Sequence, residues 1–282
     1  MLKLLGGGST MANPITKARV YFNAGKHYIK KERYLSTSLK NEKPVDISEL
    51  HEILDNYSEE RVVFVHAGLS DIKSVFHKNP YKLLLSSLDD RFDSILTPGF
   101  TPTFRKSGIY HKLYSRPEYG AFSRLFLEDA DYRTNDALHS ILVKGDYSFD
   151  DYNHFNTFSR EGCWAKLDDD NVLYMNIGVP WITATQHHYI EHYYNVPYNS
   201  SKEYNGWIYY DEFRKEPITQ VSYQYETEII RRNSIKIEDY LHSKGALERY
   251  TIDGLKLMFF RAREMRDTLE PKIEQDSYYL VD

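Results

Sequence analysis

The sequence contains a single cysteine, Cys163, among its 282 residues. One thiol can neither form an intramolecular disulfide nor build a multi-cysteine metal site, so the sequence favours a reducing compartment and a cytoplasmic location. No apolar run approaches the ~20 residues of a membrane-spanning helix. Met1–Leu5 is also too short for the core of a signal peptide. We therefore expect no membrane partner and no secretion.

A surplus of positive charge is missing as well. The 36 Lys and Arg residues are dispersed along the chain and are outnumbered by 41 Asp and Glu residues, giving a net charge of −5. Nucleic-acid-binding proteins typically concentrate basic residues in a patch, so we expect no nucleic-acid partner and a mild preference for a cationic substrate. The phenols of the 25 tyrosines suit ligands such as sugars. An AT-rich genome also raises tyrosine content.

The length and the composition, 41% hydrophobic and 27% charged, match a soluble globular protein with one α/β domain. We expect this domain to span residues 13–282. The glycine-rich stretch Gly6–Ser9 lies ahead of a second methionine, Met11. Residues 1–12 are therefore predicted to be a flexible N-terminal segment or vector-derived residues.

Hydrophobic patterns typical of strands and helices alternate along the chain. Short apolar runs predict buried strands, and helical periodicity with capping residues such as Asn79 predicts helices. The alternation indicates a mixed, largely parallel central sheet flanked by helices, with a helical C-terminal part interrupted around Gly245 and Gly254. The expected strands are Val62–Val65, Ser94–Thr97, Ile141–Val143 and Val172–Val179, and the expected helices are Ile47–Tyr57, Asn79–Leu88, Ala121–Leu127, Thr185–Tyr194 and much of Ile229–Thr268.

Polar, proton-handling side chains are concentrated in residues 185–192, with the sequence TQHHYIEH. This segment directly follows a predicted strand, and ligands of open α/β sheets bind at the carboxyl ends of strands. On a helix, Thr185, His188 and Glu191 share one face through their i, i+3 spacing. A lone histidine is usually an ordinary surface or core residue. Four such groups in eight residues after a strand favour a functional site.

The same segment matches the H-x-x-E-H pattern of some zinc sites through His188, Glu191 and His192. No second segment offers an obvious third ligand. We therefore expect no metal and keep a zinc hydrolase as an alternative.

Two further segments next to predicted strands are candidates for ligand contacts. After the strand Val62–Val65, the small residues of the sequence His66-Ala67-Gly68-Leu69-Ser70 would let backbone N–H groups approach a phosphate or a pantetheine amide, although a tight turn explains Gly68 equally well. Before the strand Ile141–Val143, the sequence contains Asp136, His139 and Ser140. These residues fit either a site or a simple cap with a core histidine.

Taken together and in order, six segments resemble the aminoglycoside 3-N-acetyltransferase family and its relatives that acylate amino sugars during surface-polysaccharide biosynthesis. The resemblance runs from about residue 45 to about residue 200 and weakens after that. It implies a single α/β domain unlike the common GNAT acetyltransferases, with acyl-CoA bound in a cleft. The matching segments are Val65–Ser70, Leu96–Phe104, Tyr119–Leu125, Asp136–Gly145, Met175–Val179 and Thr185–Tyr198.

The resemblance also implies roles for individual residues. The family's T-x-x-H-x-x-E segment supplies the active-site histidine, which corresponds here to His188 between Thr185 and Glu191. We expect His188 to be the general base, Glu191 to fix its tautomer and raise its pKa, and Thr185 or backbone N–H groups to stabilise the oxyanion. Glu191 and Asp136 are expected to hold the substrate cation. Acetyl-CoA or another acyl-CoA is expected along His66, Ala67, Gly68, Leu69, Ser70, His139 and Ser140.

Two departures and several alternatives accompany this interpretation. A serine usual among relatives is replaced by Ala67 or Gly68, and Cys163 is expected to be a small core residue rather than a nucleophile. The leading hypothesis is an acyl-CoA-dependent N-acyltransferase acting on an amino sugar, including nucleotide-linked ones, as a monomer or homodimer. The alternatives are an aminoglycoside resistance enzyme, the zinc hydrolase and a carbohydrate-binding domain.

Overall fold

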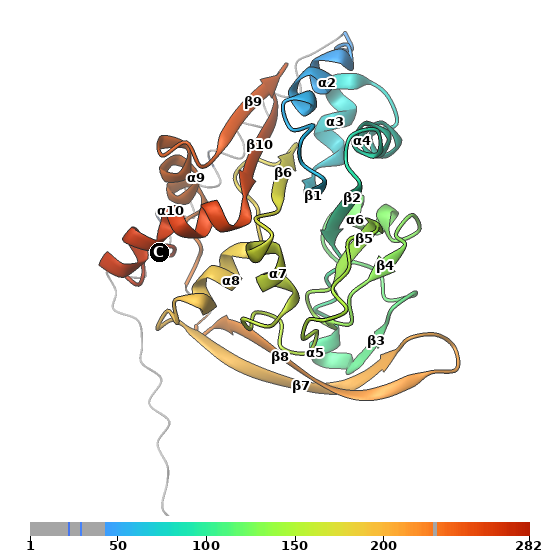
Figure 1. Cartoon of the computed structure of the whole chain (residues 1–282), viewed down its shortest axis with the longest axis vertical. Coiled ribbons are helices and arrows are strands. Elements are labelled where there is room, and N and C mark those ends of the chain that lie inside the picture. The colour runs from blue at the N-terminus through green and yellow to red at the C-terminus, as the bar shows by residue number, and fades with distance from the viewer. Residues whose placement is uncertain (1–21, 23–28, 30–42, 228–229) are drawn as a thin grey trace, which may run out of the picture.

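The computed structural model describes Phe22, Ile29 and residues 43–227 and 230–282, so the predicted segment 1–12 lies outside the described residues. The central sheet consists of β1 (Val62–Ala67), β2 (Ser94–Pro98), β4 (Tyr132–Arg133), β5 (Ile141–Gly145), β6 (Leu173–Ile177), β9 (Glu248–Ile252) and β10 (Leu255–Arg261). Its strand order is β4-β5-β2-β1-β6-β10-β9 (Figure 1). β2, β1 and β6 are parallel in the middle, and the outer pairings are antiparallel.

Helices cover both faces of this sheet. They are α2 (Ser48–Asp55), α3 (Leu69–Phe76), α4 (Pro80–Asp89), α6 (Ala121–Phe126), α7 (Cys163–Asp169), α8 (Gln186–Tyr193), α9 (Ser234–Ser243) and α10 (Ala262–Gln275). Strand β1 is buried between two apolar clusters. Its Val63 and Val65 pack with α2, α3, α4 and α6, and its Phe64 packs with α7 to α10. This follows from the alternation of side chains along a strand that is buried on both faces.

A second sheet lies beside the first and contains β3 (Ile109–His111), β7 (Asn199–Tyr209) and β8 (Lys215–Tyr225), with the short helix α5 (Phe104–Ser107) next to it. β7 and β8 form a long hairpin along the bottom of the view in Figure 1. At its open end Asn199 pairs with Tyr225. The hairpin therefore brings two polar side chains from distant positions of the sequence to the same place.

The predicted α/β class with a mixed sheet and flanking helices is confirmed, and the parallel part is the central trio of strands. The predicted cap of α4 is present, because Asn79 accepts a hydrogen bond from the Lys82 N–H at 3.1 Å. Within the part of the chain that the structure describes, no helix combines the length and apolar character needed to cross a bilayer.

The prediction that Ile229–Thr268 is largely helical, with interruptions around Gly245 and Gly254, is wrong for residues 248–261. Residues 248–261 form the hairpin β9–β10, and β10 pairs with β6. The hairpin turns at Asp253 and Gly254, which both have positive φ angles, 47° and 86°. Asp-Gly favours such a two-residue turn because both residues tolerate the left-handed conformation. The stretch His66–Ser70, expected to be a loop after the first strand, ends in the first residues of α3, Leu69 and Ser70.

Candidate active site

A cavity of about 450 Å³ opens where the parallel strands β1, β2 and β6 end. Its wall comes from the end of β1, the segment after β2, the start of α6, the residues before β5 and the segment between β6 and α8. The lining residues are His66, Ala67, Pro98, Phe100, Pro102, Arg105, Tyr119, Gly120, Ser123, Leu138, His139, Val179, Thr183, Thr185 and His188. Ligands of α/β sheets typically bind at this edge.

The segment from β6 to α8 is held firmly against the core. Buried Asn176 bonds in both directions with Thr183: its Oδ1 accepts from the Thr183 N–H at 2.6 Å, and its Nδ2 donates to the Thr183 carbonyl at 2.9 Å. At the start of α8, the Gln186 amide accepts from the Tyr174 hydroxyl at 3.1 Å and donates to the Trp164 carbonyl at 3.2 Å. Buried polar side chains with all these partners fix the position of the helix that carries His188.

His188 and Glu191 meet on α8 as their spacing predicts. The distance between His188 Nδ1 and Glu191 Oε2 is 2.8 Å. An ionised carboxylate only accepts hydrogen bonds, so His188 donates through Nδ1–H and keeps its lone pair on Nε2. The His188 side chain is 29% exposed and lines the cavity, whereas that of Glu191 is fully buried. The arrangement is that of a base oriented by a carboxylate.

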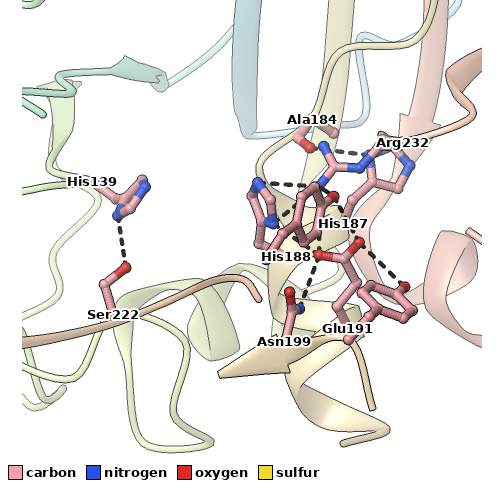
Figure 2. A network of polar contacts seen from close by, with 10 residues as sticks. His139, Ala184, His187, His188, Glu191, Asn199, Ser222 and Arg232 are labelled. Carbon is pink, nitrogen blue, oxygen red and sulfur yellow. Dashed lines mark hydrogen bonds and ion pairs between the residues drawn. The ribbon is translucent and has the colours of Figure 1, made fainter. Parts of the chain in front are cut away.

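Glu191 is surrounded by partners from β7, β8 and the segment before α9. Its Oε1 accepts from the Tyr225 hydroxyl at 3.0 Å and the Tyr198 hydroxyl at 3.4 Å, and its Oε2 accepts from Asn199 Nδ2 at 3.3 Å. Figure 2 shows the carboxylate between His188 and Asn199, with the Arg232 guanidinium above it. Arg232 Nη2 lies 3.6 Å from Glu191 Oε2 and donates to the Tyr225 hydroxyl at 3.2 Å.

The electrostatics of the pair follow from these contacts. Burial alone would raise the pKa of the Glu191 carboxyl, but the charges of Arg232 and His188 and the hydrogen bonds from His188 and Asn199 lower that pKa to about 2. Burial lowers the pKa of His188, Arg232 lowers it further, and Glu191 opposes both. The expected raising of the His188 pKa by Glu191 is thus outweighed. Near neutral pH the site holds a carboxylate and a neutral imidazole.

Several other predicted residues also lie at the cavity. His66, Ala67, Thr185 and His139 line it together with His188. His66 Nε2 is buried without a hydrogen-bond partner, and burial lowers the pKa of this imidazole to about 3. His139 packs edge-on against Phe100 and lies with Ser222 on the other side of Figure 2 from Glu191. The structure brings these side chains together, and their contacts with acyl-CoA stay a prediction.

Four predicted cofactor contacts, Gly68, Leu69, Ser70 and Ser140, do not lie in the cavity wall. A Cβ atom on Gly68 would lie 2.1 Å from the Gly178 carbonyl oxygen, so the small residue serves close packing of two loops. Leu69 and Ser70 belong to the first turn of α3. Ser140 is fully buried, and its hydroxyl donates to the Gly99 carbonyl at 2.6 Å.

The two predicted substrate-binding carboxylates are also not accessible to a substrate. Glu191 is buried, and His188, Tyr198, Asn199 and Tyr225 occupy its oxygens. Asp136 is 2% exposed, and its Oδ1 accepts from the Leu138 and His139 backbone N–H groups at 2.8 and 2.7 Å. Asp136 therefore shapes the turn that carries His139, while neither carboxylate reaches the cavity.

Metal-ligating and thiol chemistry find little support. Among residues 43–227 and 230–282, no three His, Cys, Asp or Glu side chains are placed to hold a metal ion. His192 stacks on Tyr223, with ring centroids 3.9 Å apart, instead of converging with His188 and Glu191. Cys163 is buried, and burial raises the pKa of its thiol far above the ordinary value. A buried neutral thiol is a poor nucleophile.

Sequence reasoning missed Arg232, Tyr225, Tyr198 and Asn199. Arg232 lies 44 residues after His188, in the segment before α9, and the three others lie in or just before the β7–β8 hairpin. Tyr198 ends the matching segment Thr185–Tyr198, and the other three stand in none of the matching segments. The strand-like pattern that ends at Tyr225 could have indicated the hairpin. The contact of Tyr225 with Glu191, however, depends on tertiary packing.

Comparisons with known proteins give a family model and several similar solved structures. A family model described as aminoglycoside 3-N-acetyltransferase matches residues 101–274. The comparison with curated proteins gives no sequence match.

Among solved structures, the chain is similar to the apoenzyme of aminoglycoside acetyltransferase AAC(3)-IVa, with a TM-score of 0.66 and 12% identity over 86% of this chain and 93% of that one. For AAC-IIIb in a binary complex with CoASH, the TM-score is 0.68 and the identity 13%, over 83% and 97%. For the YokD protein from Bacillus subtilis, the values are 0.67 and 15%, over 83% and 95%. Identities this low show a shared fold.

Proposed function

The chain belongs to the aminoglycoside 3-N-acetyltransferase family and is an acetyltransferase, and we propose that its acceptor is the amine of an amino sugar used in surface-polysaccharide biosynthesis, nucleotide-linked amino sugars included. The observation that carries the proposal is the His188–Glu191 pair at the cavity. It presents a neutral imidazole, oriented by a carboxylate, to a space large enough for two reacting groups.

The cavity wall fits an acyl-CoA arm. His66 Nε2 is buried there without a partner, and a polar atom of a bound molecule would satisfy it. His66, Ala67 and His139 are therefore the residues proposed to hold acyl-CoA, beside the apolar Phe100. When bound, acetyl-CoA supplies an electrophilic thioester carbonyl and a thiolate leaving group.

The chain's own residues handle the proton. An amino-sugar amine is mostly protonated near neutral pH and attacks a carbonyl only after losing a proton. His188 accepts that proton on Nε2, because its Nδ1–H is engaged with Glu191. As the new C–N bond forms and the C–S bond breaks, His188 returns the proton to the departing sulfur or to solvent. Thr185, at the cavity and 7% exposed, is proposed to stabilise the negative charge on the carbonyl oxygen.

The charge of the cavity favours a neutral or anionic amino sugar. Its titratable lining residues are three histidines, Arg105 and Tyr119, and no Asp or Glu of the described residues lines it. The acidic residues outside the described part of the chain are Glu32, Glu42 and Glu228. Aminoglycosides carry several ammonium groups, which carboxylates would have to offset in a binding site. The net charge of −5 suggests a mild preference for a cationic substrate, but the lining of the cavity does not provide the negative charge for it.

A free-CoA release assay tests this function. Acetyl-CoA and longer acyl-CoAs are each combined with three classes of acceptor: nucleotide-linked amino sugars, amino sugars whose aglycone carries no charge, and polycationic aminoglycosides. The variant His188→Asn serves as the inactive control. We expect the highest kcat/KM with acetyl-CoA and a nucleotide-linked or neutral amino sugar. Release with none of the pairs, from folded protein, would reject an amino-sugar acceptor.

Aminoglycoside inactivation is the second candidate, favoured by the family description and by neighbours such as AAC(3)-IVa, whose variant is described in complexes with a gentamicin and with apramycin. Expression in a susceptible bacterium separates the two functions, because a resistance enzyme raises tolerance to aminoglycosides. A cytoplasmic location is part of the proposal, since acyl-CoA is a cytoplasmic metabolite and the single cysteine fits a reducing compartment.

A further inference from the structure

Arg232 places a permanent positive charge inside the site, against the residue that has to accept a proton. Its Nη2 atom lies 3.0 Å from Nδ1 and 3.1 Å from Nε2 of His188. A cation this close opposes protonation of the base. It therefore needs an explanation in a site that works by general-base catalysis.

The two nearly equal distances define how Arg232 meets the ring. Nδ1 and Nε2 flank Cε1 in the ring plane, so an atom equally near to both would collide with Cε1 if it lay in that plane. Arg232 Nη2 must therefore lie over a face of the imidazole. The lone pair of Nε2 lies in the plane of the ring and stays free of this contact. Arg232 thus acts on His188 through its charge and does not occupy the position that accepts the proton.

The role of that charge follows from Glu191. A fully buried carboxylate needs a nearby counter-charge, because an isolated buried charge is very costly. Among the described residues, the other cation paired with Glu191 besides Arg232 is His188 in its protonated form. A guanidinium is always charged, so it supplies the counter-charge and leaves the imidazole neutral.

We propose that Arg232 is a positioning residue of the active site: it neutralises Glu191 from above the His188 ring, so that His188 keeps a free Nε2 lone pair for the acceptor amine. The Glu191 carboxylate can then orient the imidazole without stabilising its protonated form. After the transfer, the same charge pushes the proton off His188 towards the leaving sulfur or solvent. The inference rests on the proposed function for its catalytic meaning.

Arg232 is well placed to keep this position. Its segment pairs with residues 280–282: Arg232 bridges to Val281, the Asn233 N–H donates to the Leu280 carbonyl at 3.0 Å, and the Asp282 N–H donates to the Arg231 carbonyl at 2.9 Å. Other charged or titratable groups also face His188 from the elements around it. They are Glu191 and His187 on α8, Tyr225 on β8, Arg105 on α5 and His139 before β5. Of the two cations, only Arg232 is in contact with the ring.

The test is the pH dependence of Arg232→Met, followed in two ways. One is the acidic limb of kcat, and the other is the NMR titration of the His188 ring in protein with 15N-labelled histidine, assigned by comparison with His188→Asn. Removal of a like charge at this distance raises the pKa of the histidine, so the limb and the ring titration should move up by about one pH unit or more. Arg232→Lys, which keeps the charge, should stay closer to the wild type.

Arg160→Met is the matched control, because it removes the same charge from an exposed residue that stacks on Tyr193, away from His188. In Arg160→Met, the acidic limb of kcat and the pH at which the His188 ring titrates should stay at the wild-type values. An unmoved His188 titration in folded Arg232→Met, or equal shifts in Arg232→Met and Arg232→Lys, would overturn the proposed role of the charge. The NMR titration does not require turnover. Absence of activity in the wild type would therefore reject the proposed function and leave this inference to be decided by the titration.

Discussion

Glu191→Gln removes the buried negative charge of the site while preserving the shape of the side chain. In the folded protein the pKa of Glu191 falls from the ordinary value of 4.5 to about 2. At about 1.4 kcal/mol for each pH unit, this corresponds to about 3 kcal/mol of stability. Because the pKa is lowered on folding, that stability is fully present above pH 4.5 and is lost as the pH falls towards 2. About 2 kcal/mol of it should be gone by pH 3.

The measurement is urea unfolding, followed by the fluorescence of the three tryptophans, at several pH values between 7 and 3. The wild type should lose about 2 kcal/mol more unfolding free energy over this range than Glu191→Gln, since the amide does not titrate. Other acidic groups titrate in both proteins and cancel in the difference. At pH 7 the variant should be less stable by about 3 kcal/mol, because Arg232 loses its counter-charge, and adding Arg232→Met should recover part of that loss. Parallel pH curves for the two proteins would refute the reasoning.

Three further outcomes can be measured directly. His188→Asn should lower kcat by about 10²–10⁴-fold with acyl-CoA affinity nearly unchanged, as tested by steady-state kinetics and calorimetry, and a loss below tenfold would place the base elsewhere. Cys163→Ala should keep kcat within about twofold, because the thiol is buried and its pKa is raised; an inactive but folded variant would contradict this. Gly68→Val should lower the unfolding free energy by more than about 2 kcal/mol through collision with the Gly178 carbonyl, whereas exposed Ser70→Val should not, and equal stability of the two variants would argue against the close packing.

Local patterns predicted the parts of the fold that depend on neighbouring residues. Asn79 and Pro80 gave the start of α4, and the apolar run from Val62 gave β1. The hairpin β9–β10 was missed although Asp253-Gly254 is a strong turn signal, because the surrounding apolar spacing also fits a helix. The i, i+3 spacing predicted that His188 and Glu191 meet, and they do at 2.8 Å.

What the sequence could not predict is the surroundings of that pair. Whether Glu191 faces a substrate or lies buried depends on Tyr225 and Arg232, which reach it from 34 and 41 residues further along the chain. The same holds for Asp136, whose carboxylate is used by its own turn. The spacing of residues within one helix determines which side chains share a face. Whether those side chains are buried depends on the segments that pack over that face.

The pairing of residues 231–233 with residues 280–282 has a consequence for biosynthesis. Strand β6, which leads into α8, pairs on one edge with β1, made early, and on the other with β10, made roughly 80 residues later. The segment that carries Arg232 gains its strand-like partner only when residues 280–282 have left the ribosome. Domains begin to fold during synthesis from their N-terminal part. A ribosome-bound chain can thus assemble β1, β2 and the helices around them, but the acid–base centre becomes complete only after residues 280–282 have emerged from the ribosome.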